Sequence, residues 1–167
     1  MAAKTGTYTL INSTTLSSNQ SSITFSSIPS TFTDLILVTN GKMSAGSALN
    51  NKMTFNSDTA TNYSRTYVYG DGSSAFSGRD SSQDNLGFIY WSSTNPSTTI
   101  IQIMDYSNTT TYKTALARTS ESGVAAAYVG LWRSTSAITS ITITRGSTND
   151  FASGSTFKLY GIEAGNL

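Results

Sequence analysis

Histidine and cysteine are both absent from this chain of 167 residues. Without cysteine there are no disulfides, thiol nucleophiles or cysteine-ligated metals. Without histidine there are no Ser-His-Asp triads and no histidine metal sites, because no other side chain titrates near neutral pH at its ordinary pKa. Most enzymes rely on these residues, so we expect a protein that is not an enzyme and that holds no cofactor.

Clustered charge and long apolar runs are missing as well. The formal net charge is +1 and no two lysines or arginines are adjacent, whereas binding to nucleic acid requires clustered basic residues. No segment approaches the roughly 18 apolar residues of a transmembrane helix, and the first residues lack the apolar centre of a signal peptide. We therefore expect synthesis and folding in a cytoplasm, and neither nucleic acid nor a membrane as a partner.

Proline is scarce, at two residues, whereas serine and threonine together fill a third of the chain. Disordered chains have a similar polar content, but they lack aromatic residues and usually carry net charge. Here 11% of the residues are aromatic, and short alternations of apolar and polar residues recur through the polar background. Such alternation buries one face of a strand and leaves the other in water, so the composition favours many short strands.

Strand signals recur along the whole chain, with turn residues between them. They lie at residues 8–11, 23–25, 35–38, 53–55, 63–69, 86–91, 100–104, 112–118, 126–132, 138–143 and 157–162. Spacing of this kind is typical of sandwiches and barrels. The sequence thus predicts an all-β protein: a single-domain antiparallel β-sandwich over residues 1–167, jelly-roll-like, with about 8–10 strands.

The nine carboxylate side chains raise two chemical alternatives. A pair of carboxylates about 5–9.5 Å apart can hydrolyse a glycosidic bond, and Asp71, Asp80 and Asp84 together can supply oxygen ligands to Ca²⁺. No calcium-binding motif has their spacing, however. Most of the carboxylates are next to Gly, Asn or Ser, where aspartate typically caps a turn. We therefore expect turn-forming roles, with no catalytic residue and no metal.

Tyrosine and tryptophan are more informative, since amphipathic rings serve in cores, in interfaces and as sugar-stacking platforms. An exposed Trp91 or Trp132 in a concave surface favours sugar binding, whereas burial of both disfavours it. Arg133 next to Trp132 forms a pair typical of interface anchors, and the Gly/Asn/Asp-rich segment 145–155 is too long for a simple hairpin. The predicted interface residues are Trp132, Arg133, Arg145, Asn149, Asp150 and Phe151.

Four blocks of sequence form a pattern that extends over most of residues 25–164. Residues 25–38 read FSSIPSTFTDLILV, and the other blocks are FNSDTATNYS (55–64), YSNTTTYK (106–113), and GLWRS (130–134) followed by GSTFKLYGI (154–162). The pattern resembles small virion structural proteins of tailed phages, above all phages of marine bacteria and cyanobacteria, in which the first block has the form F-x-x-I-P-x-x-Y/F-x-D-L-x-L-V. Ser57 departs from the family pattern, because glycine is expected at that turn position.

The resemblance implies a jelly-roll-like sandwich without catalytic residues that forms part of a virion. We expect a capsid decoration or cement protein that is made in the host bacterial cytoplasm and located on the capsid exterior. It would bind the major capsid protein, assemble with itself as a homotrimer and stabilise the capsid lattice. The alternative is a tail-associated or receptor-binding module that recognises a surface polysaccharide through its aromatic side chains.

Overall fold

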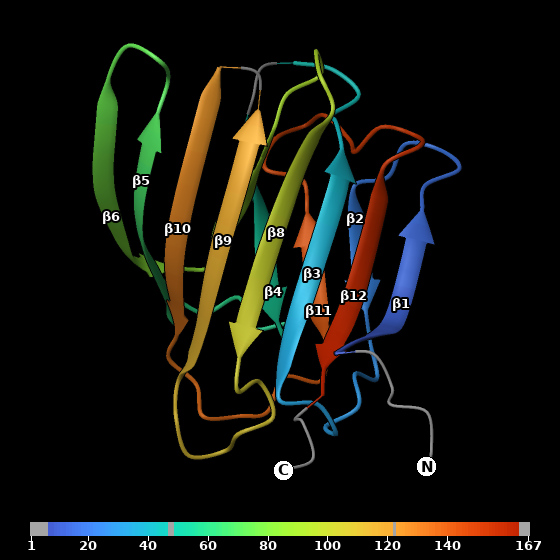
Figure 1. The fold of residues 1–167 in the computed structure, drawn as a ribbon, viewed down its shortest axis with the longest axis vertical. Helices are drawn as coiled ribbons and strands as arrows, with labels where there is room; N and C mark the ends of the chain where they lie inside the picture. The colour runs from blue at the N-terminus through green and yellow to red at the C-terminus, as the bar shows by residue number, and fades with distance from the viewer. Residues whose placement is uncertain (1–6, 47–48, 122, 164–167) are drawn as a thin grey trace.

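The computed structural model describes residues 7–46, 49–121 and 123–163, which form twelve strands in two sheets packed face to face (Figure 1). The strands are β1 (Tyr8–Thr15), β2 (Ser22–Phe25), β3 (Asp34–Gly41), β4 (Leu49–Phe55), β5 (Tyr63–Gly70), β6 (Ala75–Gln83), β7 (Leu86–Trp91), β8 (Ser97–Met104), β9 (Lys113–Glu121), β10 (Val124–Trp132), β11 (Ile141–Thr144) and β12 (Thr156–Ile162). All strand pairs among them are antiparallel. The predicted all-β antiparallel sandwich is confirmed, with more strands than the sequence indicated.

Eight of the strands form a jelly roll. The strands β1-β12-β3-β8 of the larger sheet face β2-β11-β4-β7, which make up the smaller sheet, and the chain passes between the sheets as two Greek keys. Two hairpins are inserted into this plan: β5–β6 between β4 and β7, and β9–β10 between β8 and β11. Both lengthen the larger sheet, whose full order is β1-β12-β3-β8-β9-β10-β5-β6. In Figure 1, β5 and β6 project at the left, away from β4, β11 and β2.

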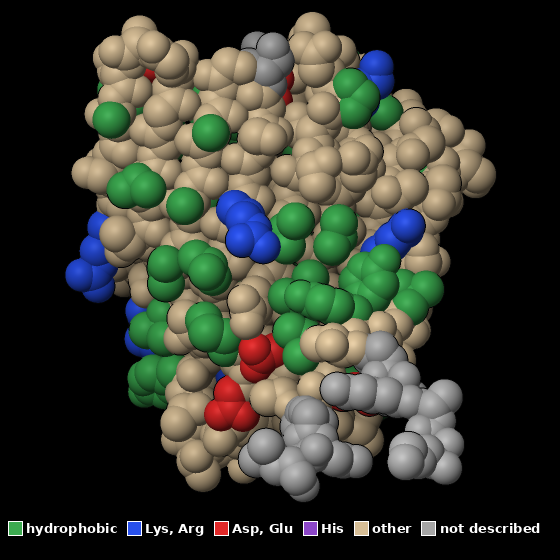
Figure 2. Space-filling view, in the orientation of Figure 1, with side chains coloured by type: hydrophobic (Ala, Val, Ile, Leu, Met, Phe, Trp, Pro, Cys, Tyr) green, Lys and Arg blue, Asp and Glu red, His purple; other side chains and the backbone are tan. Residues whose placement is uncertain are grey.

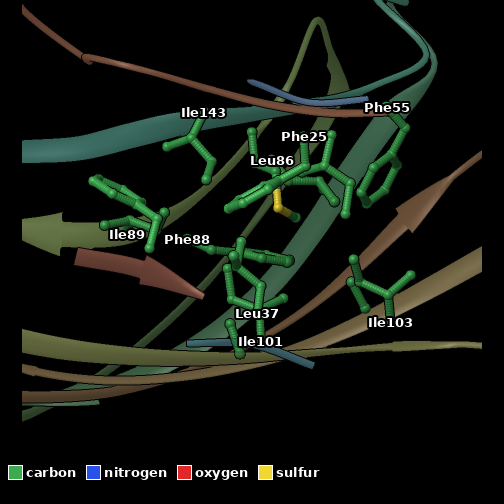
Figure 3. Packing of buried hydrophobic residues seen from close by; sticks show 14 of the residues in the cluster. Phe25, Leu37, Phe55, Leu86, Phe88, Ile89, Ile101, Ile103 and Ile143 are labelled. Atoms are coloured by element: carbon green, nitrogen blue, oxygen red, sulfur yellow. The ribbon is translucent and has the colours of Figure 1, made fainter. Parts of the chain in front are cut away.

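The core lies between the sheets and follows from the period-two alternation of the strands. Leu159, Leu37 and Ile101 are paired across β12, β3 and β8, and all three are fully buried on the inner face of the larger sheet. Side chains of the smaller sheet, such as Phe25 and Ile143, point toward them (Figure 3). Fully burying one such side chain contributes roughly 1.5–3 kcal/mol, so this cluster dominates the stability of the sandwich.

A glycine in β10 allows the two sheets to approach each other closely. A Cβ atom on Gly130 would lie 2.4 Å from Cζ of Phe88 and 2.7 Å from Cδ2 of Leu86. Both of these β7 side chains are fully buried, so position 130 admits no side chain without displacement of core atoms. The contact between β10 and the edge strand β7 therefore depends on glycine.

The connection from β4 to β5 begins with a tight turn. Asp58 N donates to Phe55 O at 2.9 Å, and the central residues Asn56 and Ser57 have φ angles of 50° and 57°. Two left-handed central residues define a type I′ turn, which favours asparagine and glycine. Asn56 Oδ1 also accepts a hydrogen bond from Thr139 N at 2.8 Å, so the turn is fixed to the segment before β11. Ser57 occupies the position where the sequence pattern leads us to expect glycine.

Each segment predicted as a strand overlaps an observed strand, but β6 was not predicted. Its sequence, AFSGRDSSQ, has no apolar alternation, and β6 becomes a strand through pairing with β5, its single neighbour in the sheet. Among the residues that the structure describes, no helix has the length and hydropathy needed to cross a membrane.

Candidate binding surfaces

The outer face of the larger sheet carries an apolar band. Leu10, Tyr160 and Ile36 are paired in one cross-strand row, and Leu116 pairs with Val129 further along the same row. These positions alternate with the buried inner rows, so the geometry of the strands places them on the outer face. We define the apolar band as Tyr8, Leu10, Ile36, Val38, Val68, Ile100, Leu116, Val129, Tyr160 and Ile162.

Much of the apolar band is open to solvent. The exposed fractions are 53% for Leu10, 56% for Val68, 41% for Leu116 and 50% for Val129. Figure 2 shows apolar side chains gathered across the middle and lower part of this face, with Lys and Arg side chains among them and Asp or Glu side chains below, whereas the upper part consists mainly of other side chains. Contiguous exposed apolar patches on soluble proteins mark interaction sites, so the band is a candidate binding surface.

Two hollows lie on the same outer face. One, of about 300 Å³, is lined by Tyr8, Ile36, Val38, Ile100, Arg118 and Tyr160. The second, of about 680 Å³, is shallow and widely open; it lies over β9, β10, β5 and β6, where small residues such as Gly70, Ala125 and Ala127 leave space. Hollows beside exposed apolar side chains suit the protruding anchors of a partner protein.

The outer face of the smaller sheet is polar. Thr24 and Thr142 are paired across β2 and β11 with their hydroxyl oxygens 3.0 Å apart, and Lys52 on β4 is exposed. The two outer faces of the sandwich thus differ: one is rich in threonine, and the other carries the apolar band, with Gln102, Arg118 and Lys158 in the same cross-strand rows. Removing the outer face of the larger sheet from water is therefore more favourable than removing that of the smaller sheet, because it buries more apolar surface.

A cleft of about 240 Å³ lies where the smaller sheet ends. It is lined mainly by Asn50, Arg65, Tyr67, Tyr69, Tyr90 and Tyr128, which come from β4, β5, β7 and β10. Tyr67 and Tyr128 are paired on the inner face of the larger sheet. The edge strand β7 is the last of the smaller sheet, so the rings of Tyr67 and Tyr69 beyond it are only partly buried.

Arg65 is held in this cleft by several contacts. Its Nε donates to Asp80 Oδ2 at 2.7 Å, and its Nη1 donates to the carbonyl oxygen of Gly87. The guanidinium carbon lies 5.6 Å from the ring centre of Tyr67 and 5.9 Å from that of Tyr128, within range of cation–π attraction. A Cβ atom on residue 87 would lie 2.2 Å from Nη1, so glycine at this position makes room for the guanidinium group.

Tyr128 carries a protonated hydroxyl into the cleft. Burial raises the pKa of Tyr128, although the positive charge of Arg65 opposes the shift. The hydroxyl donates to Asn50 Oδ1 at 3.4 Å. The cleft therefore presents hydroxyl and amide groups at neutral pH.

Trp132, one of the predicted interface residues, is buried within the chain. Its side chain is 2% exposed, its ring stacks on Tyr63 with the centroids 6.2 Å apart, and its Nε1 donates to Asp58 Oδ2. Trp132 lies inside because its ring fills the end of the core and its nitrogen finds a carboxylate there. Arg133 is engaged within the chain as well, since it donates to Ser64 Oγ at 2.9 Å.

The segment 145–155 packs against the body of the protein. Phe151 is fully buried, with its ring centroid 5.8 Å from that of Trp91 and 5.5 Å from that of Phe157, so its side chain has no surface for a partner. Arg145 forms an ion pair with Asp150. Contact of a partner with Arg133, Arg145, Asn149 and Asp150, which are partly exposed, stays a prediction.

The carboxylates of Asp71, Asp80 and Asp84 do not converge. Asp71 accepts hydrogen bonds from Ser73 N at 2.9 Å and Ser74 N at 2.8 Å, the predicted turn role, while Asp80 pairs with Arg65. Within residues 7–46, 49–121 and 123–163, no group of three or more His, Cys, Asp or Glu side chains is able to hold a metal ion.

Trp91 is fully buried like Trp132, so neither tryptophan can stack on a sugar. The rings of the cleft are tyrosines instead. The alternation of Arg65, Tyr67 and Tyr69 signals that these residues share one face of a strand. Neither the cleft nor the apolar band was predicted, because sequence alternation does not tell which faces a second sheet covers.

No model of a known protein family matches the chain, and no curated protein or solved structure matches it either.

Proposed function

We propose that this protein is a structural protein of a tailed-phage virion and decorates the exterior of the capsid. The apolar band binds the major capsid protein, and this attachment stabilises the capsid lattice. A protein that binds the assembled state and not the separated subunits shifts the equilibrium toward assembly by mass action.

The apolar band is the observation that carries the proposal. Val68, Leu116 and Val129 are each about half exposed, and completing the burial of a leucine or valine side chain contributes on the order of 1 kcal/mol. The hydrogen-bonded strands already fix the backbone beneath these side chains. Little conformational entropy is therefore lost when they dock.

Two further features support a place on the capsid exterior. The four sequence blocks resemble virion structural proteins of tailed phages. The threonine-rich outer face of the smaller sheet, with Thr24 and Thr142, suits the side that stays in water. In a particle coated by this protein, the apolar band is buried against the capsid and the threonine-rich face is in contact with water.

The position of the protein on the phage particle is the direct test. A short epitope tag inserted after Gly72, in the exposed turn between β5 and β6, is detected with gold-labelled antibody by electron microscopy. We expect label over the head surface. Label confined to the tail tip contradicts the proposal and favours the tail-associated module.

Capsid stability provides the second test. We expect heads that lack the protein to release their DNA at a lower temperature than complete heads, and purified protein to restore the difference. Equal release temperatures contradict the stabilising role. The expected homotrimer remains a prediction, which light scattering on the purified protein measures.

A further inference from the structure

We propose that the cleft beside β7 binds one pyranose residue of a neutral glycan. The site lies on the inner side of the hairpins β5–β6 and β9–β10, where the larger sheet extends past the smaller one. It is a binding function additional to capsid decoration and does not depend on it.

The extension of the larger sheet creates the site. The inner row that begins with Leu37 and Ile101 under the smaller sheet continues through Ala117 into Tyr128 and Tyr67. Leu37, Ile101 and Ala117 lie under the smaller sheet. Tyr128 is buried against Phe88 of the edge strand β7, with the ring centroids 5.7 Å apart, and Tyr67, beyond it, is only partly buried. Tyrosine has an apolar ring and a hydroxyl that can remain in water, so this uncovered face is amphipathic.

The rings of the extension form a platform. Tyr69 and Phe76 are stacked with centroids 4.7 Å apart and an interplanar angle of 18°. Tyr67 follows, 6.3 Å from Tyr69 at an angle of 27°. Because these rings are stacked on one another, the row presents mainly ring edges and hydroxyls to the cleft, and Phe76 supports Tyr69 from outside the cleft lining. The C–H groups of a pyranose can pack against this apolar row while its hydroxyls meet those of the tyrosines.

Polar groups surround the platform. The hydroxyls of Tyr67, Tyr69 and Tyr90 and the Nη2 of Arg65 make no hydrogen bond to any other residue that the structure describes. Asn50 adds an amide beside them. An apolar platform ringed by a few donors and acceptors matches the chemistry of a sugar, whose hydroxyls project around an apolar ring face.

The charges of the cleft favour a neutral ligand. Arg65 is paired with Asp80 at 2.7 Å, and no carboxylate is among the residues described as lining the cleft. Aromatic cages bind quaternary ammonium groups, but here the guanidinium of Arg65 already lies against Tyr67 and Tyr128. Single-stranded nucleic acid needs a basic track beside its stacking rings, and this cleft has a single, paired cation.

The volume of the cleft sets the size of the ligand. At about 240 Å³, it is smaller than the roughly 300–1,000 Å³ of pockets that hold drug-sized molecules. One sugar ring fits, while the remainder of a polysaccharide extends into solvent.

The cleft and the apolar band lie on opposite faces of the same sheet, because Tyr67 and Tyr69 alternate with Val68 along β5. Docking through the band therefore leaves the cleft open. This consequence rests on the proposed function: a decorated capsid displays many copies of the cleft, and multivalency strengthens a weak single-site affinity.

The test is binding of the purified protein to an array of bacterial polysaccharides and of neutral glucose, galactose and mannose oligosaccharides, with calorimetry on the best binder. We expect binding to a neutral hexose glycan that an excess of the same free oligosaccharide abolishes. Binding to no neutral glycan overturns the proposal, as does binding restricted to sulfated or sialylated glycans. The location of the protein on the phage head is measured separately, so either proposal can fail alone.

Three variants locate the binding site. Tyr69→Ala removes one ring of the platform, and we expect a Kd about tenfold higher or more. Val124→Trp fills the cleft, which Val124 lines, and leaves the rings in place, so we expect a similar loss. Tyr112→Ala removes a tyrosine that is 54% exposed outside the cleft and should leave binding unchanged. Unchanged binding in both cleft variants, with the fold verified by circular dichroism, overturns the assignment.

Discussion

The indole Nε1 of Trp132 donates a hydrogen bond to Asp58 Oδ2 at 2.7 Å, which joins the end of β10 to the turn after β4. Asn62 Nδ2 and Ala60 N donate to the same carboxylate at 2.9 Å. Burial opposes ionisation of Asp58, but these hydrogen bonds outweigh it and hold the pKa of the carboxyl below its ordinary value. Two distant segments are thus tied together by one charged acceptor.

Asp58→Asn tests how much these hydrogen bonds to the Asp58 carboxylate stabilise the fold. Because the pKa of Asp58 is lowered in the folded state, its contribution to stability is present above the unfolded-state pKa of about 3.9 and is lost as pH falls below it. We expect the variant to lose about 1–3 kcal/mol of unfolding free energy at pH 7 and less at pH 3, measured by urea denaturation. Asp84→Asn, at an exposed position, is the control. An equal loss at both pH values contradicts the role of the charge.

Tyr63→Phe tests how the Tyr63 hydroxyl affects the stability of the protein at alkaline pH. Burial raises the pKa of Tyr63 to about 12, against a hydrogen bond from Phe55 N and with the negative charge of Asp58 adding to the shift. A raised pKa in a tyrosine makes the protein lose stability as pH rises from about 10, the unfolded-state value, toward 12.

We expect Tyr63→Phe to cost about 1–2 kcal/mol at pH 7, since the hydroxyl accepts from Phe55 N and donates to Asp58 O, each at 3.0 Å. The loss of stability above pH 10 should be shallower in the variant, as followed by denaturation at fixed pH values. Tyr112→Phe, an exposed position, should not change the unfolding free energy at pH 7. If the unfolding free energy of the variant falls as steeply above pH 10 as that of the parent protein, Tyr63 is not the source of the alkaline loss of stability.

Ser57→Gly should stabilise the protein. Ser57 has a φ angle of 57°, a left-handed conformation that costs a residue with a side chain roughly 1–2 kcal/mol relative to glycine, although glycine has more entropy in the unfolded chain. We expect a net gain of about 0.5–1 kcal/mol and a higher Tm. Ser81→Gly, in the exposed part of β6, should instead destabilise. Loss of stability in Ser57→Gly would show that the turn is not strained.

Gly130→Ala should destabilise strongly, because the added methyl group meets Phe88 and Leu86 in the core. We expect a loss of about 1–3 kcal/mol. Gly70→Ala is the matched control in a neighbouring strand, since its Cβ would meet nothing closer than Ser74 O at 3.7 Å. Thermal unfolding of the two variants gives the comparison, and similar Tm values for both would contradict the close packing of β7 on β10.

Leu116→Glu with Val129→Glu should abolish binding to capsids while leaving the fold intact. The two residues are paired across β9 and β10 on the outer face, so the change places two charges in the middle of the apolar band. Thr24→Glu with Thr142→Glu makes the same change at a cross-strand pair on the smaller sheet and should bind normally. Co-sedimentation with heads that lack the protein measures the difference, and equal binding of both double variants excludes the band as the docking surface.

Local residue patterns carried most of the fold prediction. The alternation in residues 63–69 and the turn at 70–72 reappear as β5 and its tight connection to β6. β6 escaped prediction because a polar segment becomes a strand only through its neighbour. Trp132 and Phe151 were predicted at an interface, and both side chains are buried in the chain. The sequence did not indicate this burial, because an aromatic residue has the same sequence signature in a core and on a surface.

The sequence by itself determined the class of the protein: its alternating short strands predict a β-sandwich, and it contains no histidine or cysteine. The tertiary structure alone decided which faces are covered. A strand specifies two faces by alternation, but which face meets a second sheet depends on strand order, and strand order joins residues as distant as Tyr67 and Tyr128. The apolar band and the tyrosine cleft both arise at that level, because the inserted hairpins carry the larger sheet past the edge of the smaller one.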